Sequence, residues 1–255
     1  MEAIAFELKG RTAFFKKPDV NANVYFTYSH IHKIALYGLL GAIIGAGGYT
    51  QQQKSITEEG NSTFNQYPEF YQLLNKLKVS IVPHGDRGYF LKKIQVFNNT
   101  VGYASKEVGG NLIVREQWLE KPHWTIYLWN DESLEEETYN KLKNHLISST
   151  CKYVPYLGKN DHPATIEHVR LVELEEVEEV CGIESLVYSK DIFFSARGTY
   201  DNNPIYFFQE YIPIQLNSEL NYYEFDEIVH TNRKIKQTSS TLFAFQTEGR
   251  VIAFI

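Results

Sequence analysis

Residues 32–45 read HKIALYGLLGAIIG, and this stretch decides the fold. Its apolar positions, together with Ile31, recur at the spacing of one helix face, and the glycines at 45–48 predict a stop and a turn. The whole apolar run, residues 34–48, has 15 residues of which five are glycine, whereas a membrane span needs roughly 20. We therefore expect a buried helix of a soluble protein.

Two glycines lie inside this expected helix. Glycine costs about 1 kcal/mol relative to alanine in a helix, so Gly38 and Gly41 predict that another backbone packs closely there, in a contact of helix on sheet. The run contains neither GxGxxG nor GxxxxGK followed by Ser or Thr, and it lies within a helix rather than between a strand and a helix. A nucleotide-binding loop is therefore disfavoured.

The flanking segments predict an α+β fold with elements in the order strand, helix, strand, strand, helix, strand. Residues 69–77 predict an additional short helix, and the polar segment 51–66 is expected to be mobile. Ser133 and Glu136 match a capping box, which predicts the start of the last helix. The expected ranges are strand 2–9, the helix from residue 31, strand 78–83, strand 124–129, the helix to about residue 147, and strand 166–174 after the loop 155–163.

One long insertion interrupts this order at residues 85–122. Residues 90–97 and 112–119 have strand composition and flank the turn-rich segment 98–111, so we expect a protruding hairpin. The acidic run 173–179 predicts a solvated face and a domain boundary. We expect one domain at 1–175, including the insertion, and a small β-rich domain at 176–255 with strands at 205–216, 222–229, 241–246 and 250–255.

The charge and the cysteine content limit which binding partners and which cellular compartment we expect. The net charge of −6 argues against a generic nucleic-acid binder. Residues 1–130, however, carry 14 Lys and Arg against 10 Asp and Glu, while residues 131–255 carry 11 against 21, so the halves are expected to face different partners. Cys151 and Cys181 lie far apart without a CxxC motif, and the first ten residues do not resemble a secretory signal. We expect a cytoplasmic protein.

Catalytic motifs are few. Lys121 and His123, with His30, His32 and Tyr37, offer a general acid and base for RNA cleavage, in which a 2′-hydroxyl attacks its own phosphate. The same residue types also simply bind phosphate. No GxSxG nucleophile elbow is present, so a hydrolase of that class is disfavoured.

Metal motifs are equally scarce. His162, Glu167 and His168 are close in sequence, but they form neither an HExxH nor an HxxxH ligand pair. We therefore expect no metal site, no cofactor and no small-molecule substrate.

Cations interleaved with aromatic rings are more suggestive, because RNA recognition combines phosphate-pairing cations with rings on which bases stack. The rings are Phe14, Phe15, Tyr25, Tyr28 and Tyr89. The cations, which lie in or beside loops and the insertion, are Lys16, Lys17, Lys33, Arg87, Lys92, Lys93, Arg115 and Lys159.

Three segments carry a resemblance to a known family. Residues 32–45, quoted above, follow GRTAFFKKP at 10–18, and PYLGK at 155–159 precedes Pro163 and Ala164. In these segments, and over essentially the whole chain, the sequence resembles the CRISPR-associated Cas five family in its type I-B form. The first two segments are similar to that family's first strand, loop and YGLLGA-like helix, and the third is similar to its later glycine loop.

The resemblance implies a ferredoxin-like (RRM-like) domain with a hairpin called the thumb, here at about 85–122, and a small β-rich C-terminal part. It implies a subunit that caps the 5′ handle of the crRNA in the Cascade complex, between the last backbone subunit and the large subunit, in antiviral defence. The surface expected to contact the handle carries Arg11, Lys16, Lys17, His32, Lys33 and Tyr37.

Two alternatives stay open. A type I-C relative cleaves precursor crRNA with a Tyr, Lys and His set, whereas Pro122 separates Lys121 from His123 here, so we expect a binding subunit without catalytic residues. The second alternative is a protein scaffold that makes no direct contact with RNA.

Overall fold

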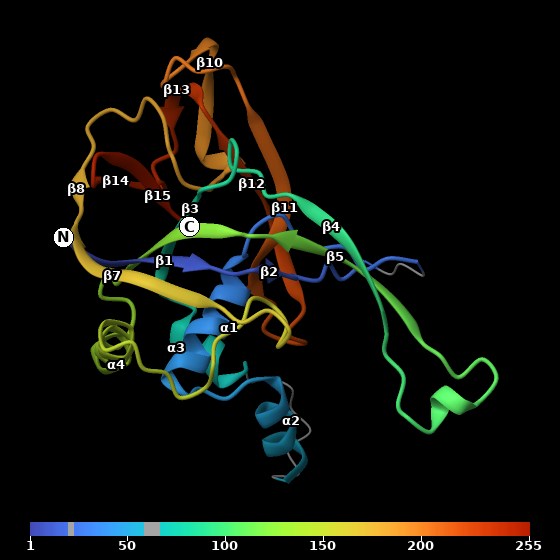
Figure 1. Cartoon of the computed structure of the whole chain (residues 1–255). Coiled ribbons are helices and arrows are strands. Elements are labelled where there is room, and N and C mark those ends of the chain that lie inside the picture. Colours follow the sequence, from blue (N-terminus) through green and yellow to red (C-terminus); the bar gives the residue numbers. More distant parts are fainter. Residues whose placement is uncertain (20–22, 59–66) are drawn as a thin grey trace.

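The computed structural model describes residues 1–19, 23–58 and 67–255, and Figure 1 shows its layers. The main sheet has four antiparallel strands in the order β3-β6-β1-β7. The protein is thus mixed α and β, with antiparallel sheets and few helices, and these four strands confirm the predicted ones to within a residue. The strands are β1 (Glu2–Lys9), β3 (Lys78–Pro83), β6 (His123–Trp129) and β7 (Thr165–Glu173).

Helices cover one face of this sheet. The helices α1 (Lys33–Ile44), α3 (Glu69–Leu74) and α4 (Glu136–Ile147) share one apolar core with Ile4, Phe6 and Leu8, alternate residues of β1. Alternation in a strand sends successive side chains to opposite faces, so Ala3 and Ala5 point the other way.

The other face is covered in part by the C-terminal strands β14 (Phe243–Thr247) and β15 (Arg250–Phe254). Trp129 packs edge-on against Phe245 and Phe254, and the Ile255 amide donates to the Val79 carbonyl at 2.9 Å. The alanines on β1 leave room for these rings. The main sheet is therefore sandwiched between helices and a small sheet.

The predicted helix at the centre of the sequence is confirmed as α1. His32 caps it, because its Nδ1 accepts from the Ala35 amide at 3.2 Å, and it ends at Gly45, whose φ of 84° is the left-handed conformation that glycine adopts freely. The sequence predicted that the glycines inside this helix pack against the sheet, and this prediction was wrong for Gly41. A Cβ on Gly41 would lie 2.5 Å from Cβ of Phe70, so the close contact is with helix α3 and not with the sheet.

Three further expectations need correction. Residues 49–58 form the helix α2 (Tyr49–Glu58), although 51–66 was expected to be mobile, and residues 59–66 lie outside the described residues. The short helix predicted at 69–77 ends at Leu74. The capping box was wrong, because α4 starts after Glu135 without a side-chain cap, and the Ser133 amide donates to Asp131 instead.

The insertion contains the expected hairpin. Its strands β4 (Lys92–Asn98) and β5 (Ile113–Glu120) pair antiparallel, and β2 (Thr12–Ala13) adds to the inner end of β5. The connection between β4 and β5, which holds the single turn η1 (Ala104–Lys106), extends away from the rest of the molecule in Figure 1. The base of the hairpin is thereby joined to the segment that precedes α1.

The C-terminal part builds two more small sheets. Of its strands, β8, β9, β10 and β13 were not predicted. One sheet has the order β11-β12-β9, and its β11 packs on α1. The Leu216 amide at the end of β11 donates to the hydroxyl of Tyr71 on α3 at 3.0 Å. The elements are β8 (Glu175–Glu176), β9 (Val187–Tyr188), η2 (Ser189–Asp191), β10 (Ile192–Thr199), β11 (Phe207–Leu216), β12 (Tyr223–Thr231) and β13 (Arg233–Thr238).

Among the described residues, no helix combines the length and the apolar character needed to cross a membrane. The domain boundary at 175 stays a prediction.

Candidate nucleic-acid interface

The segment before α1 folds back on itself and lies along β5. The Lys17 amide donates to the Phe26 carbonyl at 2.8 Å. The Tyr25 amide donates to the Arg115 carbonyl, and the Gln117 amide donates to the Tyr25 carbonyl, both at 2.9 Å. Backbone hydrogen bonds thus hold this segment against the hairpin.

Lys16 and Tyr25 are neighbours in this segment. The Lys16 ammonium lies 3.9 Å from the centroid of the Tyr25 ring, within the range of a cation–π contact. Tyr25 is 37% exposed and Phe26 is 39% exposed, so both rings are open to a base. Sequence reasoning chose Tyr25 but missed Phe26, which adjoins it.

Two cations of the segment before α1 and one of the hairpin have no carboxylate partner among the described residues. In the described part of the chain, no Asp or Glu forms an ion pair with Arg11, Lys16 or Arg115, and all three side chains are exposed. We call Arg11, Lys16 and Arg115 the free cations. They are the candidates best placed to pair with phosphate.

Lys17 is instead held by Glu210 of β11, and Lys92 by Ser29, which is itself bonded to Glu210. The Lys17 ammonium lies 2.8 Å from the Glu210 carboxylate, whose other oxygen accepts from the Ser29 amide at 2.9 Å. Lys92 donates to the Ser29 hydroxyl at 2.8 Å, and burial lowers the pKa of its ammonium. This network joins the hairpin and the segment before α1 to the C-terminal part.

Lys93 and Lys159 also have acidic partners. Lys93 pairs with Glu120 at 3.0 Å. The Lys159 ammonium lies 3.0 Å from Glu116, which is only 5% exposed and also accepts from the Trp118 indole at 2.8 Å. Burial acts to lower the pKa of Lys159, but its ion pairs outweigh burial and the pKa is raised. Lys159 therefore neutralises a buried charge.

Two residues that were predicted to contact RNA, Tyr37 and His32, are buried. The Tyr37 side chain is 1% exposed, and its hydroxyl donates to the Leu77 carbonyl at 2.6 Å. His32 is 3% exposed and caps α1, and burial lowers its pKa to about 3. Lys33 is half-buried beside the Tyr37 ring, and burial lowers its pKa to about 8. His32 and Tyr37 serve the core of the fold.

Arg87 lies in a different hollow. This hollow, of about 340 Å³, is lined by Arg87 with Glu184, Asp201, His230 and Arg250, and not by any of the free cations. The structure therefore does not group Arg87 with the other candidates.

A groove over α1 is lined in part by Lys16, one of the free cations. It has a volume of about 570 Å³ and opens beside Lys16. Sequence reasoning missed its exposed rings, although Tyr156 stands two residues before the noted Gly158. The rings that line the groove are those of Phe14, Phe15, Tyr49, Phe70, Tyr153, Tyr156 and Tyr223, together with the His32 imidazole.

Two histidines considered for RNA cleavage, His30 and His123, have separate partners. His30 is 1% exposed and hydrogen-bonded to the Trp124 indole at 3.3 Å, and burial lowers its pKa well below the ordinary value. His123 lies elsewhere on the sheet, 3.0 Å from Glu7, with its ring against that of His84. His123 therefore has different neighbours from the buried His30.

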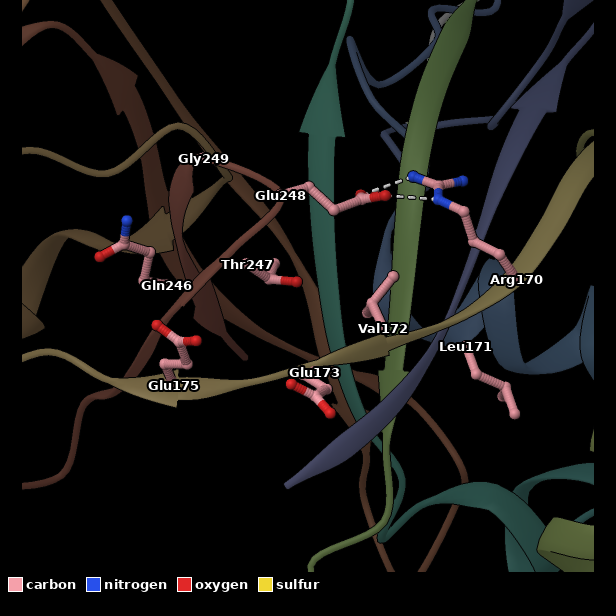
Figure 2. A pocket seen from close by; sticks show the side chains of 9 residues that line it. All are labelled: Arg170, Leu171, Val172, Glu173, Glu175, Gln246, Thr247, Glu248 and Gly249. Atoms are coloured by element: carbon pink, nitrogen blue, oxygen red, sulfur yellow. Dashed lines mark hydrogen bonds and ion pairs between the residues drawn. The ribbon is translucent and has the colours of Figure 1, made fainter.

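A further hollow, shown in Figure 2, has acidic walls. It lies between β7, β8 and the turn that joins β14 to β15, and it has a volume of about 380 Å³. The Arg170 guanidinium in it is paired with Glu248 through two contacts of 2.5 and 2.6 Å, while Glu173 and Glu175 face the same space. These carboxylates disfavour phosphate there.

Comparisons with known proteins find no matching family model and no matching curated protein. Solved structures similar to this chain include a CRISPR protein from Archaeoglobus fulgidus, at 12% identity and a TM-score of 0.49, covering 99% of this chain and 98% of that one. A chain of a CRISPR RNA-guided surveillance complex has 13% identity and a TM-score of 0.48, covering 92% and 91%. A chain of the Type III-B Cmr-beta complex bound to cognate target RNA has 8% identity and a TM-score of 0.45, covering 99% and 86%. TM-scores below 0.5 establish neither family nor function.

Proposed function

We propose that this chain is a non-catalytic RNA-binding subunit of a CRISPR-associated ribonucleoprotein complex. One observation carries the proposal, namely the Lys16 ammonium over the exposed Tyr25 ring, with no ion pair to a carboxylate in the described part of the chain. Single-stranded RNA is bound by this combination, because cations pair with phosphates while rings stack on bases in any sequence.

The finer part of the proposal is the RNA itself. We propose the 5′ handle of the crRNA in a type I-B Cascade complex, supported by the resemblance of residues 10–18, 32–45 and 155–159 to the Cas five family. The Phe14 amide donates to the Leu157 carbonyl at 3.1 Å, so the first and last of these segments are in contact. A surface that is assembled from the family's own segments fits a role shared with that family.

The fold proposed for residues 1–175 is ferredoxin-like. It is supported by the order of elements β1-α1-β3-β6-α4-β7 together with the antiparallel strand order β3-β6-β1-β7. The β4–β5 hairpin would then be the thumb.

The acidic C-terminal half indicates which kind of subunit binds this chain. The C-terminal half has a net charge of −10, which repels RNA and fits neighbouring subunits that bring basic groups. We propose the last backbone subunit and the large subunit as these neighbours. A basic neighbour would also complete the groove for an RNA that a chain of net charge −6 binds weakly by itself.

Absence of catalysis is proposed because a cleavage site needs its acid and base within hydrogen-bond reach of one bound nucleotide. His30, His32 and Tyr37 are buried, while His123 lies elsewhere on the sheet beside Glu7. The test is incubation of the purified chain with a repeat RNA hairpin. No cleavage is expected, whereas a cut at one defined site that His123→Ala abolishes would support the endoribonuclease instead.

The RNA-binding role is tested by copurification. The tagged chain would be expressed with its complex and a CRISPR array, and the RNA that stays bound would be sequenced. We expect crRNA with an intact 5′ handle, less of it when Lys16 and Arg115 are changed to Gln, and an unchanged amount for Lys141→Gln, an exposed cation on α4. If the complex assembles equally well with the double variant and retains all its crRNA, the scaffold alternative is favoured.

A further inference from the structure

A mixed cluster of carboxylates and imidazoles lies on the main sheet outside the interface. Glu7 of β1 and the adjacent Glu167 and His168 of β7 each offer one ligand atom, and these atoms lie within 4.8 Å of one another. Glu7 follows Ala3 and Ala5 on the face that β14 and β15 cover, but its side chain remains 26% exposed. This end of the sheet is therefore open to solvent.

The two carboxylates oppose each other across the strands. Glu7 and Glu167 are register partners in the β1–β7 pair. Like charges in that position destabilise a sheet unless a cation lies between them. The cation here is the Lys9 ammonium, 2.5 Å from Glu7 and 3.0 Å from Glu167, and the Lys9 side chain is 32% exposed. The two carboxylates thus attract positive charge. At present the Lys9 ammonium supplies this charge, and its exposed side chain can move away.

A β-bulge explains why consecutive residues reach the same place. Ala5 pairs with Arg170 but Glu7 pairs with Glu167, so β7 has one residue more than β1 in this interval. His168 adopts φ 54°, a left-handed conformation that few residues other than glycine adopt. Neighbours in a regular strand point to opposite faces, whereas a bulge redirects one of them. The bulge therefore lets His168 join Glu167.

A fourth donor comes from β6. His123 Nε2 lies 3.0 Å from the same Glu7 oxygen, and its ring packs against His84 with the centroids 4.3 Å apart. His123 lies outside the group of three within 4.8 Å, but its contact with Glu7 places a second imidazole beside them, on the adjacent strand β6.

We propose that Glu7, Glu167, His168 and His123 bind a divalent transition-metal ion of the Zn²⁺ class. Zinc takes four such ligands at about 2.0 to 2.2 Å in a tetrahedron, which places ligand atoms roughly 3.4 Å apart. The ligand atoms of Glu7, Glu167 and His168 lie within 4.8 Å of one another, so binding needs them to move closer, His123 to turn towards them, and Lys9 to withdraw. Imidazole ligands favour zinc over calcium or magnesium, which prefer oxygen. The ion would join β1, β6 and β7, so it would stabilise the folded chain.

The test is a titration of the full-length chain, freed of metal with a chelator, with ZnCl₂ by calorimetry. We expect one ion per chain and a melting temperature that rises with Zn²⁺ concentration. His168→Ala is expected to weaken binding by about tenfold or more, whereas Lys9→Met, which removes the competing ammonium, is expected to tighten it. Glu2→Gln, which removes another exposed carboxylate of β1, and His145→Ala, which removes a histidine on α4, should both bind as the unmodified chain does.

The Zn²⁺ affinities of the variants decide whether the proposal holds. Glu167→Gln provides a second ligand variant in case His168→Ala fails to fold, as judged by circular dichroism. The proposal is overturned if neither the unmodified chain nor Lys9→Met binds Zn²⁺. It is also overturned if a folded ligand variant binds as tightly as Glu2→Gln. A visible absorption band of tetrahedral Co²⁺, lost in the ligand variants, would support it independently.

Discussion

The Lys159 ammonium lies 3.0 and 3.3 Å from the two carboxylate oxygens of Glu116, a side chain that is almost fully buried. Loop 155–163 is thereby fixed to the base of the β4–β5 hairpin. A cation that was predicted to bind phosphate thus has a carboxylate partner within the chain.

Lys159→Met is expected to destabilise the chain. Removing one partner of a buried ion pair costs about 3 to 5 kcal/mol, and because Lys159 is 37% exposed we expect about 2 kcal/mol in the free energy of unfolding. The measurement is urea denaturation. Adding Glu116→Gln should recover part of the loss, while Lys93→Met, which breaks an exposed pair, should cost less than about 1 kcal/mol. A double variant no more stable than Lys159→Met would contradict this account.

Gly158→Ala is expected to cost several kcal/mol. Gly158 has φ 87°, and a Cβ there would lie 2.0 Å from the Phe14 carbonyl oxygen. Gly249 has φ 77° but nothing within 4 Å of its Cβ position, so Gly249→Ala isolates the cost of the backbone conformation, about 1 to 2 kcal/mol. Chemical denaturation of both variants compares them. Equal losses would mean that the contact with Phe14 contributes nothing.

His32 is expected to make stability depend on pH. Burial lowers its pKa to about 3 from the ordinary value of 6.5, so the ring stays neutral in the folded chain while the unfolded chain takes up a proton as the pH falls below 6.5. The free energy of unfolding should therefore fall between pH 6.5 and 3, by up to about 1.4 kcal/mol per pH unit for this ring. Burial lowers the pKa of His30 and of His230 in the same direction.

Two variants isolate the contribution of His32. His32→Asn keeps an acceptor for the Ala35 amide and removes the titrating ring, so the pH dependence should become shallower. His32→Ala should flatten it equally and lose about 1 kcal/mol more at every pH, because the cap is gone. Denaturation midpoints measured from pH 7 to pH 4 test both statements. A pH dependence that is unchanged in His32→Asn would refute the role assigned to this ring.

Tyr37→Phe distinguishes a core residue from an RNA contact. The Tyr37 hydroxyl donates to the Leu77 carbonyl inside the core, so its loss should reduce the free energy of unfolding by about 1 kcal/mol. RNA affinity should remain the same, as measured by fluorescence anisotropy. A drop in affinity without a loss of stability would restore Tyr37 to the interface.

Local patterns predicted most of the main sheet and α1. Apolar periodicity and the glycines at 45–48 located the helix and its end, because both signals depend on neighbouring residues. The strands β10 and β13 were missed because residues such as Ser195, Arg197 and Lys236 make their composition polar. They pair with each other at the edge of the C-terminal part, where few of their side chains are buried.

The sequence predicted which kinds of residue form the interface, but not how those residues are arranged in space. Sequence identified a mixture of cations and rings, but it could not identify which cations are neutralised. The acidic partner of Lys17 is Glu210, nearly two hundred residues away, and that of Lys159 is Glu116. The proximity of Glu7 to Glu167 and His168 was missed for the same reason, because Glu7 meets Glu167 only through strand pairing.

The most direct test of the central claim is the salt dependence of RNA binding. Binding of a labelled RNA with the sequence of the crRNA handle would be measured by anisotropy over a range of salt concentrations. Each phosphate contact on single-stranded RNA contributes about 0.7 to the slope of log affinity against log salt. Changing Arg11, Lys16 and Arg115 to Gln together should lower that slope by about 2, while Lys141→Gln should leave it unchanged. The account would be contradicted by an RNA affinity that does not change with salt concentration. It would also be contradicted if the triple variant had the same slope as the unmodified chain.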